Sequence, residues 1–262
     1  MSGNWILAAL AGVLGLAMGS AVTAISWRIP RGVSWIHGRS ACPGCGATLG
    51  ALDLIPVLSF VISRGRCRHC GVRIGWRYPL TELWCGAWAV LLYIAVGPHW
   101  VWPPLALWGS LLVALFWIDL DYQLLPDALT FPGTLIGLAA SLQIPHGARH
   151  ALLGIALGSG LLWLLAWIWI RFRKIEGMGG GDIKLAAMFG AVLGWQLTLV
   201  TLFLAALAGS LWGAWLMWRH QGDGKTALPF GTLLAPAAMV SLLWGQTWLD
   251  AYLRLLARAS AP

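Results

Sequence analysis

The chain has 262 residues, of which 59% are hydrophobic and only 10% are charged. Soluble domains average about 45–50% apolar residues, so this composition excludes an ordinary water-soluble domain. The formal net charge is +8, but nucleic-acid binding usually shows basic and aromatic residues interleaved on a soluble face. We therefore expect membrane lipid, and no nucleic acid, as the partner of the basic residues.

Apolar runs recur along the chain at a length that suits membrane helices. About 20 residues cross a ~30 Å hydrocarbon layer as a helix, which satisfies its own backbone hydrogen bonds. We predict an all-α polytopic membrane protein with about eight transmembrane helices. They cover residues 4–27, 80–97, 104–121, 128–144, 150–170, 183–195, 196–218 and 229–248, the sixth being notably short.

The first apolar run is expected to be a permanent helix rather than a signal peptide. It has no positively charged start, and Arg28 and Arg31 follow it directly. In the predicted layout one set of loops holds 14 of the 17 Lys and Arg residues, and the other set holds Arg149, Arg254 and Arg258. Because basic loops stay in the cytosol, we predict an external N-terminus and a cytosolic loop after the first helix.

The one long polar stretch, residues 28–79, carries two CxxC pairs, Cys42 with Cys45 and Cys67 with Cys70. The separation of the two pairs is typical of a zinc ribbon, in which four thiolates form a closed tetrahedral shell with no position open for chemistry. We predict a structural zinc ion, because a segment of about 50 residues with few aliphatic side chains usually needs a metal or disulfides to fold.

The alternatives to a zinc shell of four cysteines are two disulfides and a mixed shell of cysteine and histidine. Two disulfides would fit the spacing, but cytosolic thiols stay reduced. A mixed shell with His37 or His69 would also bind zinc, although we expect both to be surface residues. Cys85 lies in an apolar run and is expected to be a buried small side chain.

Acidic residues number only nine, so those near the ends of predicted membrane helices need an explanation. Asp119 and Asp121 close the third helix, and Asp182 opens the sixth. Two membrane crossings intervene, so the acids return to the same side and can meet. Two carboxyls that share one proton supply both an acid and a base, which is the chemistry of aspartic peptidases.

Spacing does not choose between Asp119 and Asp121, because they lie about 200° apart around a helix. Gly179, Gly180 and Gly181 precede Asp182 and would let a substrate backbone approach it. Two other interpretations stay open on the residues alone: a helix cap at Asp182 and an ion or proton pathway. We expect Asp127, directly after Pro126, to be the N-cap of the fourth helix.

Several motifs together resemble one known family, the type IV prepilin leader peptidases of bacterial pilus and type II secretion systems. The resemblance extends over residues 15–231 and is specific in the order and spacing of its motifs. The motifs are Gly19-Ser20 with Arg28-Ile29-Pro30, the CxxC pairs, Tyr78 to Glu82, Ile118-Asp119 to Leu125-Pro126-Asp127, Gly177 to Lys184, and Pro229-Phe230-Gly231.

This resemblance implies an aspartic endopeptidase of the bacterial inner membrane that cleaves the basic leader of prepilins and pseudopilins after a glycine, at the cytosolic face. The catalytic pair would be Asp119 and Asp182, with Gly179, Gly181 and Lys184 as supporting residues. Many members also methylate the new N-terminus with S-adenosylmethionine, an activity associated with the cysteine loop. The implied domains are residues 1–27 as the first helix, 28–79 as the zinc domain and 80–262 as the peptidase domain.

The chain departs from the family pattern near the first loop. Many relatives have phenylalanine and asparagine where this chain has Ala21 and Thr23, and tyrosine where it has Gly180. Both aspartates remain, so the departures bear on methyl transfer rather than on proteolysis. The rival hypotheses are a peptidase without methyltransferase activity, a membrane ion or proton transporter, and a scaffold that recruits partners through its zinc domain.

Overall fold

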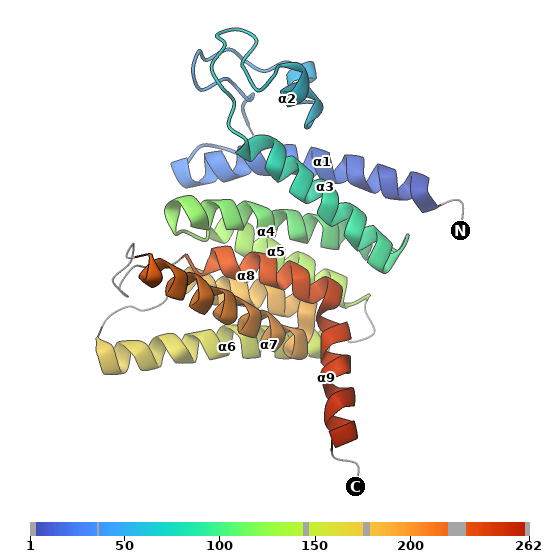
Figure 1. Cartoon of the computed structure of the whole chain (residues 1–262), viewed down its shortest axis with the longest axis vertical. Helices are drawn as coiled ribbons and strands as arrows, with labels where there is room; N and C mark the ends of the chain where they lie inside the picture. Colours follow the sequence, from blue (N-terminus) through green and yellow to red (C-terminus); the bar gives the residue numbers. More distant parts are fainter. Residues whose placement is uncertain (1–3, 36, 144–146, 175–178, 220–228, 260–262) are drawn as a thin grey trace. The chain divides into compact units, whose positions relative to one another are not determined.

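The computed structural model describes residues 4–35, 37–143, 147–174, 179–219 and 229–259 (Figure 1). Across these ranges the regular structure is helical, and the β pairing is limited to two isolated bridges, Ala41 with Thr48 and Arg66 with Arg73. By packing, the chain divides into two compact units, residues 1–118 and 119–262. The division falls near the end of helix α4 (Trp102–Tyr122).

The first unit is built on two long helices, α1 (Asn4–Arg28) and α3 (Arg77–Val96), which pack against each other. Their backbones approach closely because α1 carries glycine at the contact. A Cβ atom on Gly15 would lie 2.5 Å from the backbone oxygen of Cys85, so a larger residue there would push the helices apart. Cys85 itself is fully buried, as predicted.

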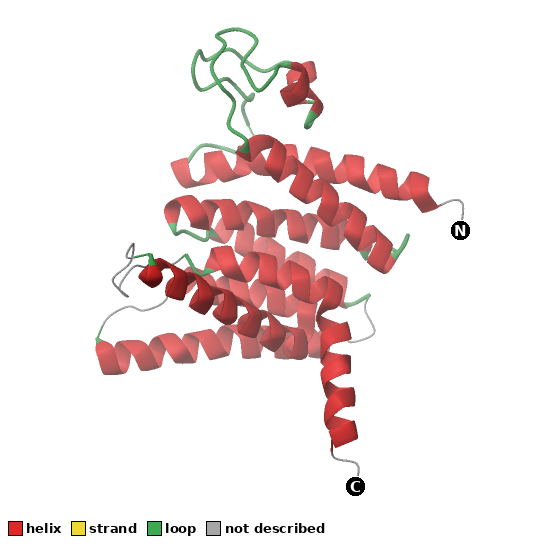
Figure 2. Cartoon of the chain, viewed as in Figure 1, coloured by secondary structure: helices red, strands yellow, loops and turns green. Residues whose placement is uncertain are grey.

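The polar segment lies between these two helices and is mostly loop, as Figure 2 shows. Its regular structure consists of three short pieces, η1 (Ile29–Arg31), η2 (Ala51–Leu54) and α2 (Leu58–Ile62). Such a segment has little apolar core of its own.

The second unit is a bundle of helices. α7 packs against α5, α6 and α8, and α9 follows α8 through the π-helical segment η3. The bounds are α5 (Asp127–Ser141), α6 (Gly147–Arg173), α7 (Gly180–Trp218), α8 (Gly231–Val240), η3 (Ser241–Gly245) and α9 (Gln246–Ala259).

α7 is not one straight helix, because it breaks at Gly194, where φ is 68° and ψ is 178°. A Cβ atom on Gly158 of α6 would lie 3.0 Å from both the Ala186 oxygen and the Thr198 Cγ2. Ala186 and Thr198 therefore lie close together, although residues twelve apart in a straight helix would be separated by about 18 Å. The chain therefore reverses at Gly194, which is why the sequence shows two apolar segments there.

Eight membrane helices are not confirmed. Of the described residues, five helices are long and apolar enough to cross a membrane: α1, α3, α4, α6 and α7. The predicted sixth and seventh helices are the two limbs of α7, and α5 is too short to be among the five. The predicted eighth helix, residues 229–248, is divided among α8, η3 and the first turn of α9.

Candidate functional site

Asp119 and Asp182 come together in the second unit. Asp119 lies near the end of α4 and Asp182 in the first turn of α7, and their exposed fractions are only 4% and 8%. The two carboxyls interact electrostatically. Asp121, by contrast, is exposed. Burial thus distinguishes Asp119 from Asp121, whereas their spacing in the sequence did not choose between them.

The Asp119 carboxylate is held by the first turn of α8. The backbone N–H of Thr232 donates to Asp119 Oδ2 at 2.7 Å, and the backbone N–H of Gly231 also bonds to this carboxylate. These N–H groups have no partner within their own helix, and a helix N-terminus stabilises negative charge. Both donors are distant from Asp119 in the sequence, so only the tertiary packing within the second unit brings them to this acid.

The position of Gly231 has no room for a larger side chain. A Cβ atom there would lie 2.8 Å from Asp119 Oδ2 and 3.0 Å from Leu125 Cδ1. In the sequence, Pro229-Phe230-Gly231 stands out only as part of a resemblance, with no role of its own. The glycine and the following threonine are therefore site residues that sequence reasoning missed, although the motif had marked the position.

Asp182 interacts with Gly179 at the N-terminus of α7 as well as with the carboxyl of Asp119. α7 begins at Gly180 with Gly179 as its N-cap, earlier than the predicted start at residue 183. The backbone N–H of Asp182 donates to the Gly179 oxygen at 3.1 Å, and the Gly179 N–H bonds back to the Asp182 carboxylate. The capping interpretation and the paired-acid interpretation are thus both compatible with this position.

The glycines before Asp182 differ in their surroundings. A Cβ atom on Gly181 would lie 2.8 Å from the Leu125 Cβ, whereas one on Gly180 would meet nothing within 4 Å. A Cβ on Gly179 would lie 3.7 Å from Asp182 Oδ2. Internal packing therefore accounts for Gly181, and the open side of the motif is at Gly179 and Gly180. Gly177 and Met178 lie outside the described residues.

Asp127 and Lys184 join the starts of α5 and α7. Lys184 Nζ lies 2.6 Å from Asp127 Oδ1, and both side chains are about half exposed. The prediction that Asp127 is an N-cap is wrong by one residue, because the N-cap is Pro126 and Asp127 is the first helical residue. Lys184 is also 5.9 Å from the ring centre of Phe131. Its ammonium group thus lies toward α5.

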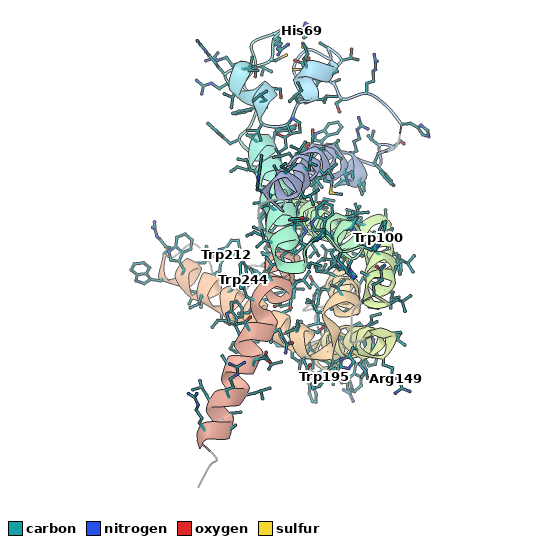
Figure 3. The ribbon with its side chains drawn as sticks, turned by 90° about the vertical axis from the view of Figure 1, so that its right-hand side faces the viewer. His69, Trp100, Arg149, Trp195, Trp212 and Trp244 are labelled. Carbon is teal, nitrogen blue, oxygen red and sulfur yellow. The ribbon has the colours of Figure 1, made fainter. Side chains whose placement is uncertain are left out.

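The four cysteines of the first unit form a cluster that could hold one metal ion. Cys42, Cys45, Cys67 and Cys70 place their sulfur atoms within 4.8 Å of one another. Cys42 Sγ and Cys70 Sγ are 3.8 Å apart, which equals the edge of a tetrahedron with zinc–sulfur bonds of about 2.3 Å. His37 and His69 are not part of the cluster described. His69 is exposed at the tip of the loop, as Figure 3 shows.

The two CxxC turns have the same backbone pattern. The Cys42 N–H bonds to the Ala47 oxygen at 2.9 Å, and the Cys67 N–H bonds to the Val72 oxygen at 2.9 Å. A glycine follows each turn at a φ of 71°, Gly46 and Gly71. This internal repeat presents two sulfurs from each turn to a common point.

The protonation of the cysteines is consistent with a metal site. The backbone N–H groups of Gly44 and Cys45 lower the pKa of the Cys42 thiol to about 7. At Cys70 the Val72 N–H lowers the pKa, but burial and three neighbouring sulfurs outweigh it and raise the pKa to about 11. A bound cation would favour the thiolate form of these cysteines and displace their protons.

A buried acid also links the cysteine loop to the helices of the first unit. Glu82 of α3 is 9% exposed, and the Val57 N–H donates to its Oε2 at 2.7 Å. The Ser20 hydroxyl of α1 bonds to the same carboxylate. Val57 has a φ of 62°, a strained conformation for a β-branched residue. In the sequence, Glu82 stands out only as the last residue of the Tyr78 to Glu82 motif.

Comparison with known proteins covers both units. Residues 13–96 match the bacterial peptidase A24 N-terminal domain, and residues 106–214 match the type IV leader peptidase family. A prepilin leader peptidase/N-methyltransferase of Burkholderia pseudomallei (strain 1026b) is 41% identical over 210 residues, which are 79% of this chain and 67% of that protein. One of Pseudomonas putida is 35% identical over 275 residues and covers 94% of both chains. No solved structure was found to match.

Proposed function

The chain belongs to the type IV leader peptidase family, and on that premise we propose that Asp119 and Asp182 cleave the leader from prepilins and pseudopilins. The observation that carries this proposal is the meeting of two nearly buried carboxyls at the ends of three helices. Buried acids in a membrane protein are costly and usually functional. Their surroundings also differ enough to assign each a role.

Asp119 is the acid whose charge is stabilised, because two backbone N–H groups of α8 bond to its carboxylate. We assign it as the base that takes a proton from water, and Asp182 as the carboxyl that holds the shared proton. The water oxygen bonds to the scissile carbonyl carbon while the Asp182 proton passes to the carbonyl oxygen. When the C–N bond breaks, Asp119 returns its proton to the leaving nitrogen and Asp182 regains its own.

The substrate must expose a carbonyl that a helix would hide in a hydrogen bond. In our proposal the apolar helix of the prepilin docks between membrane helices, and its scissile glycyl bond unwinds beside Gly179 and Gly180. Glycine eases this unwinding because it is a poor helix former. The open space at Gly180 supports this approach.

Single substitutions test the acid pair. Asp119→Asn and Asp182→Asn, each in reconstituted membranes, should lower leader cleavage by about 10²- to 10⁴-fold, the usual contribution of acid–base catalysis. Asp121→Asn is the matched control, because it removes an exposed acid two residues from Asp119. Near-normal cleavage by either member of the pair would rule out the mechanism.

We propose that the cysteine cluster binds structural zinc through Cys42, Cys45, Cys67 and Cys70. The ion would stabilise the loop and take no part in the chemistry, since four thiolates complete its shell. We further propose that the chain transfers a methyl group from S-adenosylmethionine to the new N-terminus, as the names of its relatives indicate for them. Incubation with a prepilin, with and without S-adenosylmethionine, followed by mass spectrometry of the mature N-terminus, separates this activity from proteolysis alone.

The location we propose is the bacterial inner membrane, with the N-terminus in the periplasm and the cysteine loop in the cytosol. The excess of basic residues on one set of loops supports this orientation. A transporter would place acids near the bilayer midplane in broken helices, whereas Asp119 and Asp182 lie at helix ends. A scaffold would give the buried acid pair no role.

A further inference from the structure

The helix α9 is strongly amphipathic, and it has no part in the proposed chemistry. It spans Gln246–Ala259 and buries none of its residues. At about 100° per residue, one side carries all of its large apolar side chains. They are Trp248, Leu249, Tyr252, Leu253, Leu255 and Leu256.

The opposite side of α9 is polar. It carries Gln246, Asp250, Arg254 and Arg258. Gln246 Nε2 donates to Asp250 Oδ1 at 2.9 Å along this side. The polar side thus forms its own hydrogen bond, whereas the apolar side is left exposed, with Leu255 at 63% and Tyr252 at 58%.

α9 begins at the end of the bundle remote from the acid pair. About 20 Å of helix separates Thr232, beside Asp119, from Gly245, where α9 starts. A Cβ atom on Gly245 would lie 3.0 Å from Leu197, and one on Gly194 would lie 3.5 Å from the His150 Cβ. The start of α9, the reversal of α7 and the start of α6 therefore gather at this end. Arg149 and Trp195 lie there together in Figure 3.

This end of the unit has the composition of a lipid–water boundary. Trp195, Trp244 and Trp248 are all 37–45% exposed, and tryptophan is enriched where membrane helices meet water. After η3, α9 turns away from the direction of α8 (Figure 1). Because its apolar side chains are exposed, the apolar side of α9 is not covered by the described part of the bundle.

We propose that α9 lies flat in the lipid–water interface at the end of the second unit remote from the acid pair. Its apolar side is buried among acyl chains, and Arg254 and Arg258 lie at the phosphate headgroups. An apolar side with Trp, Tyr and Leu beside a basic polar side fits a phospholipid surface. The proposal rests on the chain spanning a membrane and not on the catalytic roles of the acids.

The test uses the full-length protein in nanodiscs of phosphatidylethanolamine and phosphatidylglycerol. A fluorescent amino acid replaces Leu253 or Leu256 in separate proteins, and Ala257 or Ala251 on the polar side in matched controls. Some of the lipid carries a nitroxide quencher high on its acyl chain. We expect most of the fluorescence at the two leucine positions to be quenched and most of it at the two alanine positions to be kept.

Two results would overturn the proposal. Equal quenching on both sides would mean that α9 does not lie at the interface in this orientation. Shielded emission at Leu253 and Leu256 without quenching by lipid would mean that protein, such as a second copy of the chain, covers the apolar side. Leader cleavage is expected to be unchanged in all four proteins because α9 contributes no buried residue, so a failure of the acid-pair mechanism would be distinguishable.

Discussion

Each of the two units buries a carboxyl group between helices, and the two groups have different neighbours. Glu82 in the first unit and Asp119 in the second both accept a backbone N–H at 2.7 Å from a residue distant in sequence. The donor to Glu82 is Val57 in the cysteine loop, and the donor to Asp119 is Thr232 at the start of a helix. Only for Asp119 does the structure record a second acid as an interacting partner.

This difference distinguishes a structural anchor from the reaction centre that we propose. A buried carboxylate whose oxygens are satisfied by a loop and a helix holds those elements together. A buried carboxylate beside a second acid can share a proton with it and pass protons to a substrate. The contrast predicts that substitutions in the two units will affect different measurements.

The largest effect on cleavage outside the acids themselves is expected from Gly231→Ala. Its Cβ would collide with Asp119 Oδ2, and a displacement of about 1 Å at a reacting group can cost about 10²-fold in rate. We expect leader cleavage to fall by about that factor while zinc content is unchanged. Gly160→Ala in α6 is the control, because its Cβ meets nothing within 4 Å and it lies outside the proposed substrate site. Equal rates for the two variants would show that close packing on Asp119 is unimportant.

The cysteine cluster should show the opposite pattern. The double variant Cys42→Ser with Cys67→Ser removes one ligand from each turn, and elemental analysis should find that zinc is lost almost completely. The loop should then become sensitive to protease, because metal binding and folding are coupled in such small domains. Cys85→Ala, outside the cluster, should keep its zinc. Absence of stoichiometric metal from the unmodified protein would contradict the assignment.

Glu82→Ala should affect stability more than chemistry. It leaves the Val57 N–H and the Ser20 hydroxyl without their acceptor, which costs about 1–3 kcal/mol for buried groups. We expect a lower thermal unfolding temperature and leader cleavage within a few-fold of normal. Glu82→Gln, which keeps one acceptor oxygen, should be intermediate. Loss of cleavage comparable with that of Asp119→Asn would mean that Glu82 is more than an anchor.

The smallest effect is expected from Lys184→Gln. The pair with Asp127 is half exposed, and such pairs contribute about 0–1 kcal/mol, so the cleavage rate should fall by less than about tenfold. The exchanged pair, Asp127→Lys with Lys184→Asp, should recover part of the loss if the contact positions α7. A loss that the exchange deepens would instead indicate a direct role for the ammonium group.

Much of the fold could be predicted from local sequence patterns. The CxxC spacing predicted the cysteine cluster, since each turn is a short backbone motif that glycine completes at Gly46 and Gly71. Apolar runs located the long helices, because length and composition alone decide which segments suit a membrane. The number of membrane helices was less predictable, because α5 is too short to be among the candidate spans and the predicted eighth helix is divided among α8, η3 and α9.

The acid pair was only partly predictable. Charges at the ends of apolar runs marked Asp119, Asp121 and Asp182, and a resemblance was needed to choose among them. Burial makes the same choice on physical grounds, with Asp119 inside and Asp121 exposed. The position of the donors to Asp119 was marked only by the Pro229-Phe230-Gly231 motif, which indicated no role for them. Lys184 was predicted to support the site without any indication that Asp127 is its partner.

By itself, then, the sequence determined the helical membrane class, the two cysteine turns and the short set of candidate acids, because these depend on residues close together in the chain. Only the tertiary structure decided that the first turn of α8 holds Asp119 through the distant Thr232, and that Glu82 joins a loop to two helices. Such pairings depend on how helices pack, and packing is set by close contacts between distant segments rather than by the pattern within any one of them.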